Sequence, residues 1–570
     1  MLEFQIMKRL IAIVSALFLI LSLQGQTKQA IIHTNQPYYV TGETMWFRIN
    51  LPKGFTGIKG KAKVIIKGST NNVIGDFFVE QADLAINGYF KIPFSASSDL
   101  YNVAVYVLEN QTLNPIRLLN FDVPIYNDLE AGALIPVFPE SSKRNKAEID
   151  VASHLQFNVN LSQNNYSIGD EVRLEAQVLD ASGKPVPAEF SVSVIDEGLL
   201  GSSTNDYCMF STDIDLGVNT VIGMDDRLFV QGKVYNAESD SPTAISIMGA
   251  FTSKTNEMHF GKSRSDGNFT VLIPEKKGAQ NLQLVGYLYD EVPNTKVELF
   301  SGEPLDRDGL QFTNAFDADV TQYIDASNQR KRIYQQFKTL ENNAVFEPIE
   351  NKRLEVRPNK TFRMDEYVEF ETVGVFFDEI FGAQLTFEKE GEVYKAKMFN
   401  PRKNRSSSAM QNFYFKLDPI FIVDGKMTKD ADYIYRMPLD QVDEINLYFD
   451  WRDIEKQFGL FGDFGYVVIR SRKGGISLPP ADEDDILKIN GYQPLPDYPV
   501  TIAKDDSGLP QLRPNVFWHP SLKSSGNTQK GKVSFLASDD ISKFKVLVMA
   551  RTADGNVLTK QVSYTSSIEK

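Results

Sequence analysis

The chain has a single cysteine, Cys208, and only four histidines among its 570 residues. One cysteine excludes an intramolecular disulfide, so the domains must be held together by their hydrophobic cores. The four histidines (His33, His154, His259 and His519) lie far apart in the sequence, and no His-Glu-x-x-His or Gly-x-Ser-x-Gly motif occurs. These shortages predict a protein that is not an enzyme, and they leave no catalytic, cofactor-binding or metal-binding residue to assign.

Negative charge exceeds positive charge, with 74 aspartates and glutamates against 60 lysines and arginines. The net charge is -14 and the lysines and arginines do not cluster, which argues against a nucleic-acid surface. Acidic runs at 225–226 and 482–485 lack the alternating ligand spacing of a calcium loop, so we interpret them as solvated charge. No cofactor or small-molecule substrate is indicated. Cys208 stands beside Tyr207 and Met209, and is expected to be a small buried residue.

A long apolar run occurs only near the amino terminus. Lys8 and Arg9 precede the segment 10–23, whose length of about 14 residues falls short of the roughly 20 that a membrane-spanning helix needs. This pattern predicts a signal peptide at 1–25, cleaved near Gly25 or Gln26. The protein is therefore expected to be exported to the periplasm. Cys208 is too far from the cleavage site to carry a lipid anchor.

The rest of the sequence favours a mainly β fold with several domains. Hydrophobic residues make up 42% of the chain and aromatic residues 11%, which is enough for real cores. Short segments alternate apolar and polar residues between turn-forming residues, which is typical of β-sandwiches: 45–49, 63–67, 101–108 and 190–194.

One helix is predicted, at 325–342. Ile333, Phe337 and Leu340 fall at helical spacing there, and Ser327 is a suitable N-cap. We assign this helix to a linker at 303–350.

An internal repeat is the first specific signal. Residues 39–47 align without gaps to residues 166–174, which indicates two copies of one module. The glycine of each copy suits a turn with positive φ, and the alternation places the two apolar positions on one buried face. The shared positions are Tyr39, Gly42, Glu43, Met45 and Phe47 in the first copy, and Tyr166, Gly169, Asp170, Val172 and Leu174 in the second.

The repeat resembles the macroglobulin-like domains of the alpha-2-macroglobulin superfamily. Residues 33–48 (HTNQPYYVTGETMWFR) are similar to the phrase T-D-K-P-x-Y-x-P-G-E-x-V-x-F-R that opens such domains, and 191–196 (SVSVID) to the strand that ends them. The resemblance implies macroglobulin-like sandwiches at 26–127 and 150–226. Cys208 lacks the Cys-Gly-Glu-Gln context of the family's thioester, so thioester-dependent protease trapping is not expected.

Two further stretches resemble known β modules. Residues 230–234 and 265–274 are similar to a carboxypeptidase regulatory-like domain, placed at 227–302, in which an Asp266-Gly267 turn would direct Phe269, Val271 and Ile273 into the core. Residues 513–520 and 531–539 resemble the closing macroglobulin-like module of large Bacteroidota envelope proteins, which implies a separate C-terminal β domain at 481–570.

Three phrases in order, at 419–425, 439–447 and 458–475, resemble the plug domain of TonB-dependent outer-membrane receptors. Such plugs carry phrases like P-L-x-V-V-D-G, D-I-E-x-I-E-V and Y-G-x-x-G-A-x-G-V-I-x-I-x-T-K-x-G. The resemblance implies a small α+β plug-like domain at 351–480. About 95 residues follow it, too few for the barrel of such a receptor. Gly425, Phe458, Phe461 and Phe464 can serve either folding or contact.

Together these features predict a non-catalytic periplasmic scaffold or gating subunit at the outer membrane. Its expected partner is an outer-membrane β-barrel protein of a transporter, a protein-export translocon or an assembly machinery, bound through the plug-like domain, so that membrane association is peripheral. The alternative is an envelope or surface adhesion protein that binds through its sandwiches. A protease inhibitor is less favoured, because the sequence has neither a clear bait segment nor covalent chemistry.

Overall fold

The structure is a computed structural model of the chain. The predicted signal peptide and the acidic runs at 225–226 and 482–485 lie outside the residues that it describes. Within the described part of the chain, no helix is both long and apolar enough to cross a membrane. The described residues are 29–52, 60–82, 84–109, 113–130, 135–137, 154–200, 208–215, 227–243, 247–252, 257–273, 277–287, 295–305, 311–313, 318–336, 357–380, 384–400, 414–415, 417–450, 452–454, 464–473, 476–477, 479, 486–494, 512 and 514–568.

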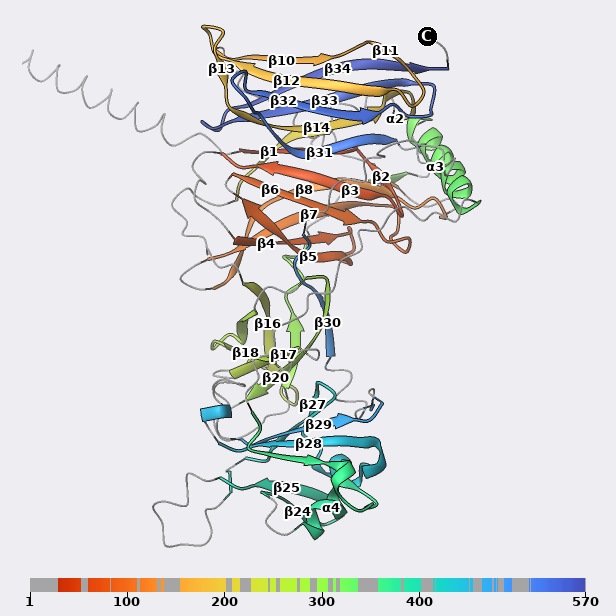
Figure 1. The fold of residues 1–570 in the computed structure, drawn as a ribbon. Helices are drawn as coiled ribbons and strands as arrows, with labels where there is room; N and C mark the ends of the chain where they lie inside the picture. Colours follow the sequence, from red (N-terminus) through yellow and green to blue (C-terminus); the bar gives the residue numbers. More distant parts are fainter. Residues whose placement is uncertain are drawn as a thin grey trace, which may run out of the picture. The chain divides into compact units, whose positions relative to one another are not determined.

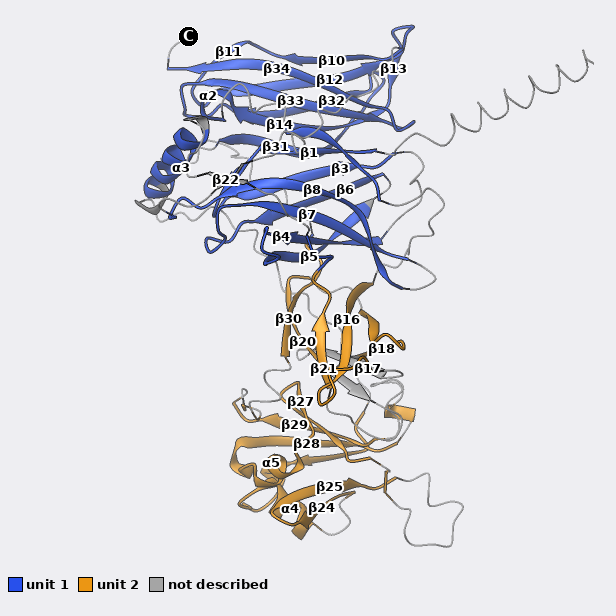
Figure 2. Ribbon diagram, turned by 180° about the vertical axis from the view of Figure 1, so that it is seen from behind, with its two compact units in different colours: residues 1–224, 302–345, 494–570 blue, residues 225–301, 346–493 orange. Residues whose placement is uncertain are grey.

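The fold is mainly β, as predicted, and it divides into two compact units (Figure 2). Unit 1 comprises 1–224, 302–345 and 494–570, and unit 2 comprises 225–301 and 346–493. The chain therefore passes back and forth between the units rather than forming a simple string of domains.

The first β-sandwich of unit 1, called sandwich 1, is continuous in sequence. Its strands form one curled sheet in the order β1-β3-β6-β5-β4-β7-β8-β2, with β15 (Met209–Asp213) added beside β1. The bounds are β1 Gln29–Thr34, β2 Tyr39–Val40, β3 Thr44–Asn50, β4 Gly60–Lys67, β5 Val73–Ala82, β6 Ala85–Lys91, β7 Asp99–Leu108 and β8 Pro115–Tyr126.

The second β-sandwich, called sandwich 2, is built from two distant segments. Strands β10-β12-β32 form one sheet, with β13 also paired to β12, and β11-β34-β33-β14-β31 form the other. The bounds are β10 Gln156–Leu161, β11 Asn165–Ser167, β12 Glu171–Leu179, β13 Pro185–Val186, β14 Ala188–Asp196, β31 Asn515–Lys523, β32 Lys530–Leu536, β33 Lys543–Thr552 and β34 Val557–Ser567.

The two sandwiches share one strand order. The run β1-β3-β6 corresponds to β10-β12-β32, and β5-β4-β7-β8-β2 corresponds to β31-β14-β33-β34-β11. In both, the short second strand pairs in parallel with the last one, β2 with β8 and β11 with β34. The difference lies at one hairpin. A turn at 68–72 joins β4 to β5, whereas residues 197–514 separate β14 from β31.

This topology corrects two predicted boundaries. The segments at 150–226 and 481–570 are not separate domains, because β12 pairs with β32 and β14 pairs with both β31 and β33. The C-terminal strands supply the missing half of sandwich 2. The sequence motifs near 513–520 and 531–539 resemble a complete module because strand patterns do not reveal their pairing partners.

The repeat is confirmed at the level of hydrogen bonds. Gly42 and Gly169 adopt φ of +86° and +73°, as predicted for both turns. The acid that follows each glycine accepts from the backbone N–H three residues earlier: Glu43 from Val40 at 2.9 Å, and Asp170 from Ser167 at 2.8 Å. The apolar residues of both copies are buried in the two sandwich cores, as predicted: Met45 and Phe47 in one, Val172 and Leu174 in the other.

Segments from the interval 197–514 return to unit 1 as β15 and as two helices. The helices are the short α2 (Glu197–Leu200) and the long α3 (Ala318–Gln336) (Figure 1). Two short strands, β9 (Ile135–Val137) and β22 (Gln311–Thr313), also pair here. Helix α3 begins earlier than the predicted residue 325, because Val320 and Tyr323 continue its apolar face into a buried cluster. Ser327 therefore lies inside the helix, buried, and is not its N-cap. Phe337 and Leu340 lie outside the described residues.

Unit 2 contains a small sandwich of two sheets, β19-β16-β21 and β18-β17-β20-β30. Gly267 has a φ of +80°, and Phe269, Val271 and Ile273 are buried, as predicted for this turn and strand. Strand β30 belongs here and not to the predicted C-terminal domain, because it pairs with β20. The bounds are β16 Leu228–Asn236, β17 Ile247–Thr252, β18 Glu257–Lys262, β19 Asn268–Ile273, β20 Ala279–Tyr287, β21 Thr295–Leu299 and β30 Ile486–Asn490.

The remainder of unit 2, called the α/β domain, has a five-stranded sheet in the order β23-β28-β29-β26-β27, with a separate hairpin β24-β25. The bounds are β23 Lys360–Arg363, α4 Val373–Glu379, β24 Leu385–Glu390, β25 Val393–Met398, β26 Ile420–Val423, β27 Lys426–Thr428, α5 Ala431–Arg436, β28 Val442–Tyr448 and β29 Tyr466–Ser471, with short 3-10 helices η4 Met364–Glu366 and η7 Leu439–Gln441.

Candidate interaction surfaces

The three phrases that suggested a plug-like domain meet in one sheet of the α/β domain. The first phrase forms β26, the second forms η7 and β28, and the third includes β29, which lies between β26 and β28. Their apolar residues share a single core with α4, α5 and the hairpin β24-β25. The order of the phrases in the sequence therefore reflects a compact unit.

The sequence allows Gly425 and Phe464 to serve either folding or contact with a partner. In the structure both serve folding. Gly425 has a φ of +84° in the turn after β26, and Phe464 is 4% exposed in the core. Asp424, beside that glycine, accepts from the backbone N–H of Ser471 at 2.9 Å and from its hydroxyl at 2.6 Å. Phe458 and Phe461 lie outside the described residues.

The two edges of this sheet differ. At the β27 edge, the side chain of Gln283 from β20 forms two hydrogen bonds with the backbone of Met427, donating to its carbonyl and accepting from its N–H, both at 2.8 Å. The amide of Gln283 thus takes the place of a neighbouring strand and is itself buried. At the other edge, β23 pairs with β28 on one side, and no described strand pairs with its other side.

Charged residues form a row that ends at the β23 edge. Arg363, Glu444 and Arg470 occupy facing positions on β23, β28 and β29. The Glu444 carboxylate lies 3.9 Å from Arg363 and 3.5 Å from Arg470. Arg363 is the outermost member, with 64% of its side chain exposed.

Aromatic and apolar residues come shortly after β23 in the chain, and one of them packs on it. Tyr367 packs on Phe362 of β23 and on Phe376 of α4, with ring centroids 6.2 and 5.1 Å apart. Phe370 packs on Phe376 in the same way, and the neighbouring Val368 is 74% exposed. The β23 edge therefore combines a charged end with an apolar flank. Sequence reasoning missed these residues, because nothing in the pattern 360–370 shows which strand lies at an edge.

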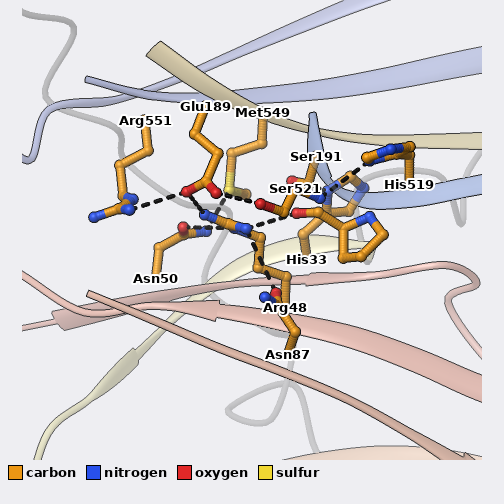
Figure 3. Close-up of polar contacts among 11 residues, drawn as sticks. His33, Arg48, Asn50, Asn87, Glu189, Ser191, His519, Ser521, Met549 and Arg551 are labelled. Atoms are coloured by element: carbon orange, nitrogen blue, oxygen red, sulfur yellow. Dashed lines mark hydrogen bonds and ion pairs between the residues drawn. The ribbon is translucent and has the colours of Figure 1, made fainter. Parts of the chain in front are cut away.

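A second group of polar residues joins the two sandwiches of unit 1 (Figure 3). Arg48 of β3 is buried and forms ion pairs and hydrogen bonds across the junction: to Glu189 of β14 at 2.5 Å and to the Pro520 carbonyl of β31 at 2.7 Å. Arg551 of β33 contacts the same Glu189 oxygen at 3.0 Å. Burial raises the pKa of Glu189 but the two arginines and Ser521 outweigh it, so the pKa falls to about 2.

Beside this ion pair, His33 and Ser191 form a contact that resembles a nucleophile and its base, with 2.8 Å between Nδ1 and the hydroxyl oxygen. Both side chains are buried between the sandwiches, and the His33 ring packs edge-on against Trp518. Burial, and then the charge of Arg48, lowers the pKa of His33 to about 3. Both side chains are enclosed by the two sandwiches, and their contact packs the junction.

Of the other singled-out residues, His519 of β31 lies in the same region as His33 and Ser191 (Figure 3), because its strand pairs with β14 there. His259 lies on β18 in unit 2, and His154 precedes β10. Cys208 is fully buried, as predicted. Within the described residues, no group of His, Cys, Asp and Glu side chains is arranged to hold a metal ion.

Comparison with known proteins gives likeness to bacterial alpha-2-macroglobulins. The native Escherichia coli alpha-2-macroglobulin aligns with 95% of this chain at 9% sequence identity and a TM-score of 0.23. The trypsin-activated form also aligns with 95% of this chain, at 9% sequence identity and a TM-score of 0.24. A Salmonella alpha-2-macroglobulin that had reacted with methylamine aligns at 9% sequence identity and a TM-score of 0.23. The chain spans 40 to 42% of the length of these three structures. No protein-family model and no curated protein matches the sequence.

Proposed function

We propose that this protein is a non-catalytic, exported scaffold or gating subunit that binds an outer-membrane β-barrel complex through its plug-like α/β domain. The observation that carries the proposal is the assembly of the three plug-like phrases into one sheet with one core. The described strands that follow this domain, β30 and β31 to β34, belong to other sheets of the chain. The proposal assigns the barrel to a partner protein.

In this proposal the sandwiches of unit 1 serve as the rigid support. Arg48, Glu189 and His33 lie at the junction between the sandwiches. Strand β3 is buried along nearly its whole length, because one face packs in the core of sandwich 1 and the other packs at the junction. In this proposal the junction holds the two sandwiches together, because separating them would leave buried charges without their partners. The macroglobulin-like character of the sandwiches belongs to the same proposal, since such domains act as spacers and binding surfaces.

The test is affinity purification of the tagged, full-length protein from detergent-solubilised envelopes of its own cells. The expected result is an outer-membrane barrel protein recovered in amounts comparable with the bait. Recovery of no barrel protein would contradict the proposal.

A variant that lacks 351–475 separates the proposal from adhesion through the sandwiches. The proposal predicts that this variant loses the barrel protein, whereas adhesion through unit 1 predicts that binding is retained. Arg173→Glu is a matched control. Arg173 lies on β12 of sandwich 2, and 72% of its side chain is exposed. This substitution is expected to leave the recovery of the barrel protein unchanged.

A further inference from the structure

We propose that the β23 edge of the α/β domain binds an extended segment of a partner protein as an additional strand, with an acidic side chain opposite Arg363 and an apolar side chain on the flank of Tyr367 and Val368. The inference rests on the proposed function in one respect, that the α/β domain is the part that binds a partner. It adds the mode of recognition and the chemistry of the bound segment.

The first step of the argument is the contrast between the two edges. A sheet edge exposes backbone N–H and C=O groups that pair readily with another strand, and proteins commonly cover such edges. The β27 edge is covered by the buried amide of Gln283. Among the described residues, no strand or side-chain amide plays that part at β23. Addition of a strand at an open edge is a common way to bind an extended peptide.

The second step is the sign of the charges. Along the row from β29 to β23 the charges alternate as Arg470, Glu444 and Arg363, with the carboxylate between the two guanidinium groups. Facing residues of opposite charge on neighbouring strands stabilise a sheet, and like charges destabilise it. A strand added outside β23 therefore continues the alternation when it places Asp or Glu opposite Arg363.

The third step concerns the other face of the added strand. Phe362 points away from Arg363 into the core with α4, and Tyr367 packs beside it. Successive side chains of a strand point to opposite faces, so the neighbour of the acidic residue would lie on this aromatic flank, next to Val368. The bound segment is thus expected to alternate acidic and apolar residues.

A second copy of this chain fits poorly as the occupant. Two antiparallel copies of β23 centred on one another would bring Arg363 of one opposite Lys360 of the other, and like charges at facing positions are unfavourable. The bound segment is therefore expected to come from a different protein.

The test uses the full-length protein with two short capped peptides, one of alternating valine and glutamate and one of alternating valine and lysine. The wild-type protein is expected to bind the glutamate peptide about fivefold more tightly than the lysine peptide. Arg363→Glu is expected to reverse this preference, and Arg363→Gln, which places no carboxylate beside Glu444, to remove it. Arg173→Glu in unit 1 is the matched control and is expected to change nothing.

Hydrogen exchange at 360–363 provides the readout that is specific for strand pairing, since exchange there is expected to slow when the glutamate peptide is bound. Equal affinity for both peptides, or binding without slower exchange at 360–363, would overturn the proposal. Failure of both peptides to bind would also overturn it and would assign Arg363 to protection of the edge against aggregation. None of these outcomes depends on recovery of a barrel protein, so the proposed function can fail separately.

Discussion

The two sandwiches of unit 1 have the same strand order, but one is continuous and the other is interrupted. In sandwich 1, the turn from β4 to β5 closes with a hydrogen bond from the Gly68 N–H to the Asn72 carbonyl. In sandwich 2, the equivalent position holds residues 197–514, which include all of unit 2. A hairpin in this fold can therefore be opened to carry a large insertion while the strand order is preserved.

The insertion is accommodated because its ends remain adjacent. The N–H of Asp196 at the end of β14 donates to the carbonyl of Pro514 before β31, at 2.9 Å. Closing a flexible loop becomes less favourable only logarithmically with its length, so a loop of this size costs roughly 4 kcal/mol more than a short turn. The buried pairing of β14 with β31 and β33 offsets this free-energy cost of loop closure.

The junction between the sandwiches gives the largest predicted effect. Glu189→Ala leaves the buried guanidinium of Arg48 without its ion pair and is expected to lower the free energy of unfolding by roughly 3–5 kcal/mol. Chemical denaturation followed by tryptophan fluorescence measures this, because Trp46 and Trp518 lie at the junction.

The matched control is Glu175→Ala on the outer sheet of sandwich 2, where Glu175 pairs with Lys530 and Lys532 at the surface. Its effect is expected to be close to zero, since surface ion pairs contribute little. Equal effects of the two substitutions would show that the junction does not hold the sandwiches together.

The equivalent acids of the repeat provide the second prediction. Asp170 accepts from its own turn at Ser167, whereas Glu43 also accepts from the hydroxyl of Tyr323 at 2.7 Å and lies 3.4 Å from Arg330, both on α3. Glu43→Ala is expected to cost about 2–3 kcal/mol and Asp170→Ala about 1 kcal/mol, because hydrogen bonds to charged groups are stronger when buried. Thermal unfolding of both variants measures the difference, and equal losses would mean that α3 gains nothing from Glu43.

Acid is expected to weaken the junction through His33. Its pKa is lowered from 6.5 to about 3 in the folded protein, so the unfolded chain binds a proton below pH 6.5 that the folded chain does not. Stability is therefore complete above pH 6.5 and falls by roughly 1.4 kcal/mol per pH unit below it, or about 2 kcal/mol at pH 5. Denaturation curves at pH 7 and pH 5 measure the loss. In His33→Gln the loss between these pH values should disappear, and a full loss in that variant would assign it to other groups.

The sequence allowed the local structure of both repeats to be predicted, because Gly42 and Gly169 and the alternating residues after them depend on neighbours along the chain. The turn at Gly267 and the burial of Phe269 were predicted for the same reason. The start of α3 was missed because Val320 and Tyr323 are recognisable as helical only through the cluster that they join.

Pairing over long distances could not be predicted. Strands β31 to β34 have the pattern of a complete sandwich, and only the partner strands β12 and β14 show that they form half of one. The side chain of Gln283 covers the β27 edge through its hydrogen bonds to the backbone of Met427. No local sequence motif indicates such a contact.

Native-state hydrogen exchange in low denaturant tests the central claim most directly, because it measures the opening free energy of each strand. If sandwich 2 is one domain made of two distant segments, the buried amides of β12 and β14 must open with the same free energy and denaturant dependence as those of β32 and β33. An opening of β31 to β34 as a unit of their own, with β12 and β14 still protected, would contradict the account.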